Sequence, residues 1–313
     1  MNAPLHAGVI GVGYLGRFHA QKWAAQADAE LVGVVDSDPA RVAAVAAEVG
    51  CAAYTDYLEL LGRVDAVSVA VPTEHHHRVV RDCLMAGVHV LVEKPITQTV
   101  AEADALIELA RARGLLLQVG HLERFNPAWL AMWPLLEQPP RFIEAHRLAP
   151  FKPRGTDVSV VLDLMIHDLD LILSLVDSPV TEVRASGTPV LTDGIDIGNA
   201  RLEFANGCVA NLTASRVSAA TLRKMRLFLK DQYLAIDFGE RRASRAHRSD
   251  DPAAPIALTE VTVPAGDALQ MEIEAFAAAV REGHAPPVSG DDGRRALALA
   301  LQIVDLMQRS LPR

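Results

Sequence analysis

The first 121 residues alternate between short apolar runs and longer segments in which apolar positions recur every three or four residues. Short apolar runs bounded by turn residues indicate buried strands, whereas the wider spacing indicates amphipathic helices. Alternating strands and helices predict a parallel, doubly wound sheet. We expect strands at 6–10, 31–36, 65–72, 88–95 and 115–121, with helices at 17–26, 41–50, 76–87 and 99–114.

The remainder of the chain has a different pattern. Asn206-Gly207 separates two alternating runs and is a strong signal for a tight hairpin turn. Strands joined by tight turns predict a mostly antiparallel sheet, and therefore an α+β domain after the α/β domain. We place the domains at 1–121 and 122–313, and leave open whether the last helix packs back on the first domain. Further strands are expected at 141–148 and in a hairpin over 225–238, helices at 160–176, 268–283 and 293–311, and a polar loop over 240–255.

Composition narrows the class of protein. The formal net charge of −9 argues against a nucleic-acid partner. Three widely spaced cysteines form no metal-binding or disulfide pattern, which predicts reduced thiols and a cytoplasmic location. No signal peptide and no long uninterrupted apolar run is evident, so we expect no membrane partner. The run His75-His76-His77 does not suggest a metal site, because consecutive side chains point in different directions.

A glycine-rich segment, GVGYLG, follows the first predicted strand and opens the first predicted helix. Gly11 allows a tight turn, Gly13 allows the backbone to approach a pyrophosphate, and Gly16 allows close packing of helix on strand. The free N–H groups of the helix N-terminus attract phosphate. The motif is weak alone, but in this strand–helix context it predicts a dinucleotide-binding domain.

Asp36 ends the second predicted strand, 20 residues after Gly16. A carboxylate at this place accepts hydrogen bonds from ribose hydroxyls and repels a 2′-phosphate. The sequence therefore predicts NAD as the cofactor, in preference to NADP. Arg41 is close in sequence and could weaken that preference.

The apolar segment 160–173 carries Asp163, His167 and Asp170 at spacings that share one helix face. Such a polar stripe either faces water or lines a site. A second candidate is Lys94, which follows a predicted buried strand and precedes a proline that favours extended backbone before it. Taken alone, Lys94 could equally be a surface charge.

Taken together, GVGYLG, PTEHHHRVV (72–80), AGVHVLVEKP (86–95) and the D-x-x-x-H-x-x-D helix resemble the Gfo/Idh/MocA family of glucose–fructose oxidoreductase, inositol dehydrogenase and relatives. The resemblance covers nearly the whole chain. It implies a Rossmann domain, a second domain with a large open sheet, and a homodimer or homotetramer. It also implies a dehydrogenase that oxidises a sugar hydroxyl.

The resemblance also assigns residues. It implies Lys94 and His167 as catalytic residues, with Asp163 binding or orienting the substrate. Val160, Val161 and Met165 stand where relatives often have glycine, which indicates a reshaped pocket. The cofactor-binding candidates from motif and resemblance are Gly11, Gly13, Tyr14, Leu15, Gly16, Asp36, Pro72, Thr73, His76, Glu93 and Lys94.

The segment GHLERFNPA (120–128) is similar to that of family members that are UDP-N-acetylglucosamine 3-dehydrogenases. A nucleotide sugar needs cations near its diphosphate, and guanidinium groups suit phosphate. The substrate-binding candidates are Arg124, Asn126, Arg147, Lys152, Arg154, Asp163 and Asp170. The alternatives are surface or interdomain salt bridges for the arginines, a free sugar or inositol as substrate, and a non-catalytic NAD-binding sensor.

Overall fold

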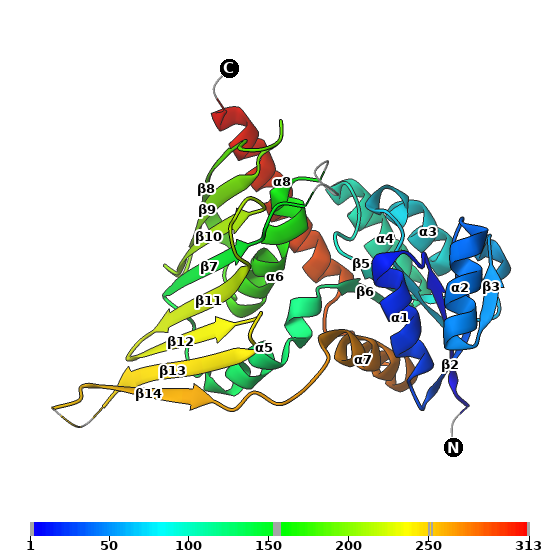
Figure 1. Cartoon of the computed structure of the whole chain (residues 1–313), viewed down its shortest axis with the longest axis horizontal. Coiled ribbons are helices and arrows are strands. Elements are labelled where there is room, and N and C mark those ends of the chain that lie inside the picture. The colour runs from blue at the N-terminus through cyan, green and yellow to red at the C-terminus, as the bar shows by residue number, and fades with distance from the viewer. Residues whose placement is uncertain (1–2, 153–157, 250, 252, 312–313) are drawn as a thin grey trace. The chain divides into compact units, whose positions relative to one another are not determined.

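The structure, a computed structural model, describes residues 3–152, 158–249, 251 and 253–311. The chain forms two compact units (Figure 1). The first contains residues 1–122 and 268–297, and the second contains residues 123–267 and 298–313. Residues 268–297, which we assign to the second domain from the sequence, thus cluster with the first unit.

The first unit is built on a six-stranded parallel sheet with strand order β3-β2-β1-β4-β5-β6. This order, in which the sequence reverses direction between β1 and β4, is that of a dinucleotide-binding Rossmann fold. The elements are β1 (Leu5–Ile10), α1 (Tyr14–Ala24), β2 (Ala29–Val35), α2 (Pro39–Val49), β3 (Ala52–Tyr54), η1 (Tyr57–Glu59), β4 (Ala66–Val69), α3 (Thr73–Met85), β5 (His89–Glu93), α4 (Val100–Arg113), β6 (Leu117–Gly120) and α7 (Ala268–Glu282).

Local sequence explains how these helices begin and how they attach to the sheet. Thr99 and Glu102 form the expected capping box at the start of α4. Trp23 of α1 is fully buried, packs edge-on against Phe276 of α7, and donates its indole N–H to Ser68 Oγ at 2.8 Å. Burial of these aromatic rings fixes α1, and hence the glycine-rich turn before it, on the sheet.

The second unit is built on an eight-stranded sheet in the described residues, with order β14-β13-β12-β11-β7-β10-β9-β8. Only β7 and β10 pair in parallel, which confirms the predicted α/β plus mostly antiparallel α+β fold. The elements are η2 (Leu122–Phe125), α5 (Pro127–Met132), η3 (Trp133–Leu135), β7 (Phe142–Leu148), η4 (Val161–Met165), α6 (Ile166–Leu175), β8 (Val180–Thr188), β9 (Ile197–Phe204), β10 (Val209–Ser215), β11 (Leu222–Leu229), β12 (Gln232–Asp237), β13 (Arg242–Arg248), β14 (Ile256–Val261) and α8 (Gly290–Ser310), the last of which begins in the first unit.

Two expectations differ from the structure. The predicted loop over 240–255 is wrong, because residues 242–248 form strand β13 between β12 and β14. Successive side chains of β13 alternate between the two faces of the sheet, and among them only Ala243 is fully buried, so the strand carries no apolar run. The predicted helix from residue 160 is α-helical only from Ile166, since Val161–Met165 form a wider π turn. Within the described residues, none of the helices combines the length and apolar character that crossing a membrane requires.

Candidate active site

In the first unit, the predicted cofactor residues gather where the parallel strands end. Gly11 and Gly13 follow β1, Asp36 follows β2, and Pro72 lies three residues after the end of β4, at the N-cap of α3. A cavity of about 840 Å³ opens here, large enough for a cofactor. Its lining includes five of the predicted residues, Gly11, Gly13, Leu15, Asp36 and Pro72.

The three motif glycines have different geometries. A Cβ atom on Gly16 would lie 1.8 Å from the carbonyl oxygen of Gly11, so only glycine allows this helix to meet the turn. Gly11 has a φ of +87°, and a Cβ atom there would lie 2.8 Å from the backbone of Ala70. A Cβ atom on Gly13 would meet nothing within 4 Å. Gly13 therefore borders open space at the N-terminus of α1, which fits the approach of a pyrophosphate.

The carboxylate of Asp36 is buried and accepts several hydrogen bonds. One oxygen accepts the backbone N–H of Val12 at 3.0 Å. The other accepts the backbone N–H of Asp38 and the guanidinium of Arg41, both at 3.0 Å. Arg41 is half-exposed and also lies 3.3 Å from the Asp38 carboxylate. The acid expected to bind ribose is thus fixed by the glycine-rich turn and partly neutralised by an arginine.

The segment Glu93-Lys94-Pro95 is held at the end of β5 by two buried histidines. The His19 Nε2 atom of α1 lies 2.9 Å from Glu93 Oε1, and the other Glu93 oxygen accepts the backbone N–H of Lys94 at 3.2 Å. Burial acts to raise the pKa of Glu93, but hydrogen bonding to His19 and the charges of His19 and Lys94 bring it below its usual value. On the other side, the ring nitrogens of His76 lie 2.9 Å from the carbonyl oxygens of Pro95 and Val71.

In the second unit, the π turn and the first turn of α6 carry the other candidate catalytic groups. Asp163 is exposed and His167 is partly exposed. Their neighbours Asp168 and Asp170 are buried. A π turn inside a helix often marks a functional site, because it displaces side chains from regular helical positions. The expected stripe is therefore split, since Asp163 and His167 reach the surface whereas Asp170 points into the protein.

Two arginines clamp the buried carboxylates of α6. Arg147 lies at 2.8 and 3.0 Å from the oxygens of Asp168 and at 2.8 Å from Glu123. Burial acts to lower the pKa of Arg147, but the charges of Asp168 and Glu123 overcome this and raise it. Arg124 binds Asp170 with contacts of 2.6 and 2.8 Å. These ion pairs hold the helix that presents His167.

The other substrate candidates have different surroundings. Asn126 is buried, donates to Glu123 at 3.0 Å, and caps α5 by accepting the backbone N–H of Ala128 at 3.0 Å. Lys152 is exposed, whereas Arg154 falls outside the described residues. In the first unit, Tyr14 and Leu15 are exposed at the start of α1, and Thr73 begins α3.

Several residues near the site were missed by sequence reasoning. Thr55, Asp56, Tyr57 and Arg78 line the same cavity as Asp36. Their position could have been found, because the first three follow the end of β3 and ligands bind beyond strand ends. The contact between His19 and Glu93 has no sequence signal, since the two residues are 74 positions apart.

The comparisons with known proteins agree with this arrangement. Residues 5–121 match the family model described as "Oxidoreductase family, NAD-binding Rossmann fold", and residues 140–234 match "GFO/IDH/MocA C-terminal domain". The UDP-N-acetylglucosamine 3-dehydrogenase of Acidithiobacillus ferrooxidans is 45% identical over 302 residues, which are 96% of each chain. A solved structure of that enzyme has a TM-score of 0.93 and 44% identity, and covers 98% of this chain and 99% of its own.

A more distant solved structure shows the same fold. Levoglucosan dehydrogenase in complex with NADH has a TM-score of 0.88 and 19% identity, and covers 98% of this chain and 97% of its own. The glycine turn, the open space at Gly13 and the cavity at the strand ends are what a bound nicotinamide dinucleotide requires.

Proposed function

Since the chain belongs to the Gfo/Idh/MocA oxidoreductase family, we propose that it oxidises the 3-hydroxyl of UDP-N-acetylglucosamine to a ketone with NAD. The observation that carries the proposal is the 45% identity to a UDP-N-acetylglucosamine 3-dehydrogenase over 96% of both chains. The matched region covers nearly the whole chain and therefore extends through both units.

The side chains suit alcohol oxidation. His167 takes the proton of the sugar hydroxyl, which its partly exposed ring at the start of α6 allows. Lys94, as a cation, stabilises the developing oxyanion, and Asp163 orients the sugar. When bound, the nicotinamide accepts the hydride that leaves the sugar carbon. The proposed dinucleotide contacts come from the glycine-rich segment and from the neighbouring strand ends: Gly11, Gly13, Tyr14, Leu15, Gly16, Pro72, Thr73, His76 and Glu93.

Asp36 supports NAD in preference to NADP. Its carboxylate is buried at the cavity and has the position from which an acid accepts ribose hydroxyls. Arg41 neutralises part of its charge, so we expect discrimination against NADP to be moderate rather than absolute.

For the nucleotide part of the substrate, Lys152 is a candidate for binding the diphosphate because its side chain is exposed. Arg124 and Arg147 contribute through Asp170 and Asp168 in this structure, and a direct role requires that these ion pairs open. Asn126 and Arg154 stay in the proposed set, together with Asp170.

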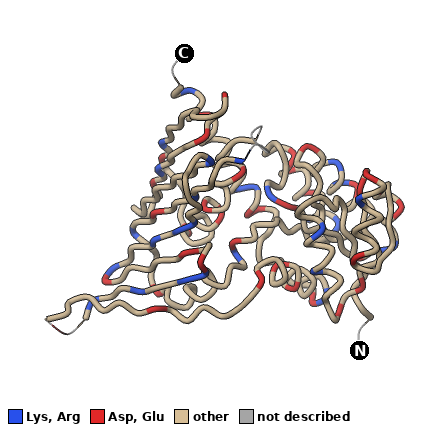
Figure 2. The backbone as a smooth tube through the Cα atoms, in the orientation of Figure 1, with Lys and Arg blue, Asp and Glu red and all other residues tan. Residues whose placement is uncertain are grey.

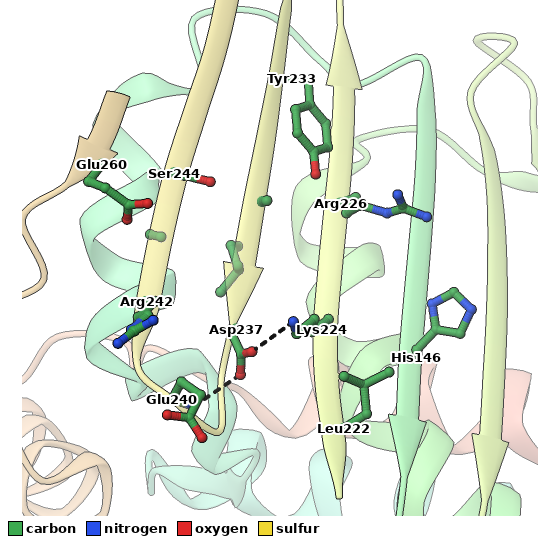
Figure 3. Close-up of a pocket in the computed structure, with 13 residues that line it drawn as sticks. His146, Leu222, Lys224, Arg226, Tyr233, Asp237, Glu240, Arg242, Ser244 and Glu260 are labelled. Carbon is green, nitrogen blue, oxygen red and sulfur yellow. Dashed lines mark hydrogen bonds and ion pairs between the residues drawn. The ribbon is translucent and has the colours of Figure 1, made fainter. Parts of the chain in front are cut away.

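We also propose a homodimer or homotetramer that uses the open face of the second sheet. Charges of both signs are interspersed along its strands (Figure 2). The face has a shallow hollow of about 690 Å³, in which Lys224 pairs with Asp237 beside Tyr233 and Arg226 (Figure 3). Tyr and Arg are enriched at subunit contacts whereas Lys, Asp and Glu are depleted there, so the proposal rests mainly on the resemblance to the family. The free thiols of Cys51, Cys83 and Cys208 support a cytoplasmic location. We keep residues 1–121 and 122–313 as the two proposed domains.

The test is NADH formation with UDP-N-acetylglucosamine, beside free N-acetylglucosamine, inositol and a second UDP-sugar, with a carbonyl trap to draw the oxidation forward. We expect turnover with UDP-N-acetylglucosamine and little with the free sugars. Turnover only with a free sugar or inositol would keep the reaction class but reject the nucleotide-sugar substrate.

Two variants test the assigned roles. Lys94→Met and His167→Asn should bind NADH normally in a fluorescence titration but lose turnover by about a hundred- to ten-thousandfold. Near-normal turnover of either variant would remove that residue from the mechanism. Tight NADH binding by the wild-type chain without turnover of any sugar would favour a sensor.

A further inference from the structure

The imidazole of His19 and the carboxylate of Glu93 form a buried contact next to Lys94. His19 is 1% exposed in α1, three residues after Gly16, and its Nε2 atom lies 2.9 Å from Glu93 Oε1. A carboxylate can only accept, so this nitrogen carries the proton and donates. The second Glu93 oxygen accepts the backbone N–H of Lys94 at 3.2 Å. One carboxylate therefore connects the imidazole to the peptide unit that places the lysine.

The geometry restricts what Glu93 can do. A Cβ atom on Gly120 of β6 would lie 3.2 Å from the Cα atom of Glu93 and 3.3 Å from its carboxylate, so the neighbouring strand leaves the side chain little room. His19 makes its polar contact from the opposite side, out of α1. The carboxylate is thus confined between a helix and a strand, and its hydrogen bonds determine its orientation.

The contact between His19 and Glu93 would be an unfavourable way to stabilise the fold alone. The Nδ1 atom of His19 is buried and has no hydrogen-bond partner among the described residues. A buried polar atom without a partner destabilises the folded state, a cost that an apolar side chain at this place would avoid. The polar contact that offsets this cost is the one to Glu93, which points to a role at the Lys94 segment.

We infer that His19 is a positioning residue: its hydrogen bond fixes the Glu93 carboxylate, and that carboxylate sets the place and the charge environment of Lys94. The inference rests on the proposed catalytic role of Lys94. Helix α1 then has two roles in the same site, because it follows the glycine-rich turn and also supports Lys94. The N-terminal end of α1 borders the dinucleotide, and its middle supports the lysine that acts on the substrate.

The charges around Glu93 indicate how the effect would be measured. His19 approaches from α1 and Lys94 from β5, while His76 of α3 feels the charge of Glu93, which acts to raise its pKa. His121 follows Gly120 on β6. Glu93→Gln would remove that negative charge and disfavour the charged form of the neighbouring ammonium, whereas loss of the hydrogen bond from His19 would leave the carboxylate charged but free to turn.

The experiment compares His19→Leu with His19→Gln, whose amide nitrogen can still donate to Glu93. For His19→Leu we expect kcat to fall about ten- to a hundredfold through misplacement of Lys94, with the NADH dissociation constant within about twofold of wild type. His19→Gln should restore most of kcat. Glu93→Gln, which removes the charge itself, should move the alkaline limb of the kcat–pH profile about one unit towards lower pH and leave the acidic limb in place.

The matched control is Ser68→Ala, which removes the other buried side-chain hydrogen bond between α1 and the sheet, that of Trp23. It should lower the melting temperature as the His19 variants do, but leave kcat and the pH profile unchanged. If His19→Leu behaves like Ser68→Ala, His19 is only structural and the inference is overturned. If His19→Leu does not fold, Glu93→Gln replaces it, and an unshifted alkaline limb in that variant overturns the inference equally.

The same set separates this inference from the proposed function. Near-normal turnover of Lys94→Met would refute the catalytic lysine itself. Loss of turnover in Lys94→Met with a wild-type kcat in His19→Leu would refute only the role of His19.

Discussion

The two units prepare their chemical groups in different ways. In the first unit, the cofactor end is built mainly from backbone: a glycine turn, the free N–H groups of α1, and a carboxylate fixed by the N–H groups of Val12 and Asp38. In the second unit, the helix with His167 is held by side chains, through the ion pairs of Arg147 and Arg124.

This difference has a physical consequence. A site built from backbone requires glycines, because any side chain at these positions would collide with neighbouring atoms or with the ligand. A site held by buried ion pairs depends on mutual compensation, so removal of one partner leaves the other buried and charged. The variants below test whether each unit responds in the expected way.

The largest effect is expected for Arg147→Ala, because it leaves Asp168 and Glu123 buried without their cation. Removal of one partner of a buried pair costs about 3 to 5 kcal/mol in the free energy of unfolding, measurable by urea denaturation. Arg201→Ala is the control, since Arg201 pairs with Glu203 at 3.2 Å on the exposed face of the same sheet and should cost less than about 1 kcal/mol. Equal effects of the two substitutions would show that the buried pair is not what holds α6.

In the first unit, Gly16→Ala and Gly13→Ala form a pair with opposite expectations. The new Cβ atom of Gly16→Ala would lie 1.8 Å from the Gly11 carbonyl oxygen, so the turn must open, at a cost of about 3 kcal/mol. Gly13→Ala meets no protein atom within 4 Å and should unfold at the wild-type urea concentration. It should nevertheless weaken NADH binding, because the methyl group occupies the space of the pyrophosphate. Unchanged NADH affinity in Gly13→Ala would place the cofactor elsewhere.

These examples show what sequence reasoning can and cannot reach. Gly11, Gly13, Gly16 and Asp36 could be placed from the sequence because their roles follow from local backbone geometry and spacing. The contacts of Arg147 and Arg124 could not, since a cation's partner depends on which distant carboxylate the fold brings near it. Strand β13 was missed for a related reason: Ala243 is its one fully buried residue, so no apolar run marks it.

Asp36 and Arg41 form an ion pair within the site that is otherwise built from backbone. Substitutions of this pair therefore show whether side-chain charges also matter in the first unit. Asp36→Ser should weaken NADH binding about ten- to a hundredfold, the value of lost hydrogen bonds to a charged acceptor, and should improve NADPH binding. Arg41→Ala should do the reverse for NADPH, because it exposes the full charge of Asp36 to the 2′-phosphate. Fluorescence titration of both cofactors needs no sugar substrate. Parallel changes for NADH and NADPH in either variant would rule out discrimination at this pair.

The smallest effect is expected at Asp196. This carboxylate lies in the second unit but is held by backbone N–H groups, as Asp36 is in the first unit. It accepts the N–H groups of Val190, Leu191 and Thr192 at 2.7 to 2.9 Å in the turn between β8 and β9. Burial acts to raise the pKa of Asp196, but these hydrogen bonds lower it to about 2.

A lowered pKa in the folded state stabilises the protein above the unfolded pKa of about 4, and this contribution is lost as pH falls towards 2. Asp196→Asn should therefore reduce the free energy of unfolding by about 2 kcal/mol at pH 7 and by about 1 kcal/mol at pH 3. Urea titrations of both proteins at pH 7, 5 and 3 measure the difference. A difference that does not change with pH would mean that the shape of the turn, and not the charge of Asp196, supplies the stability.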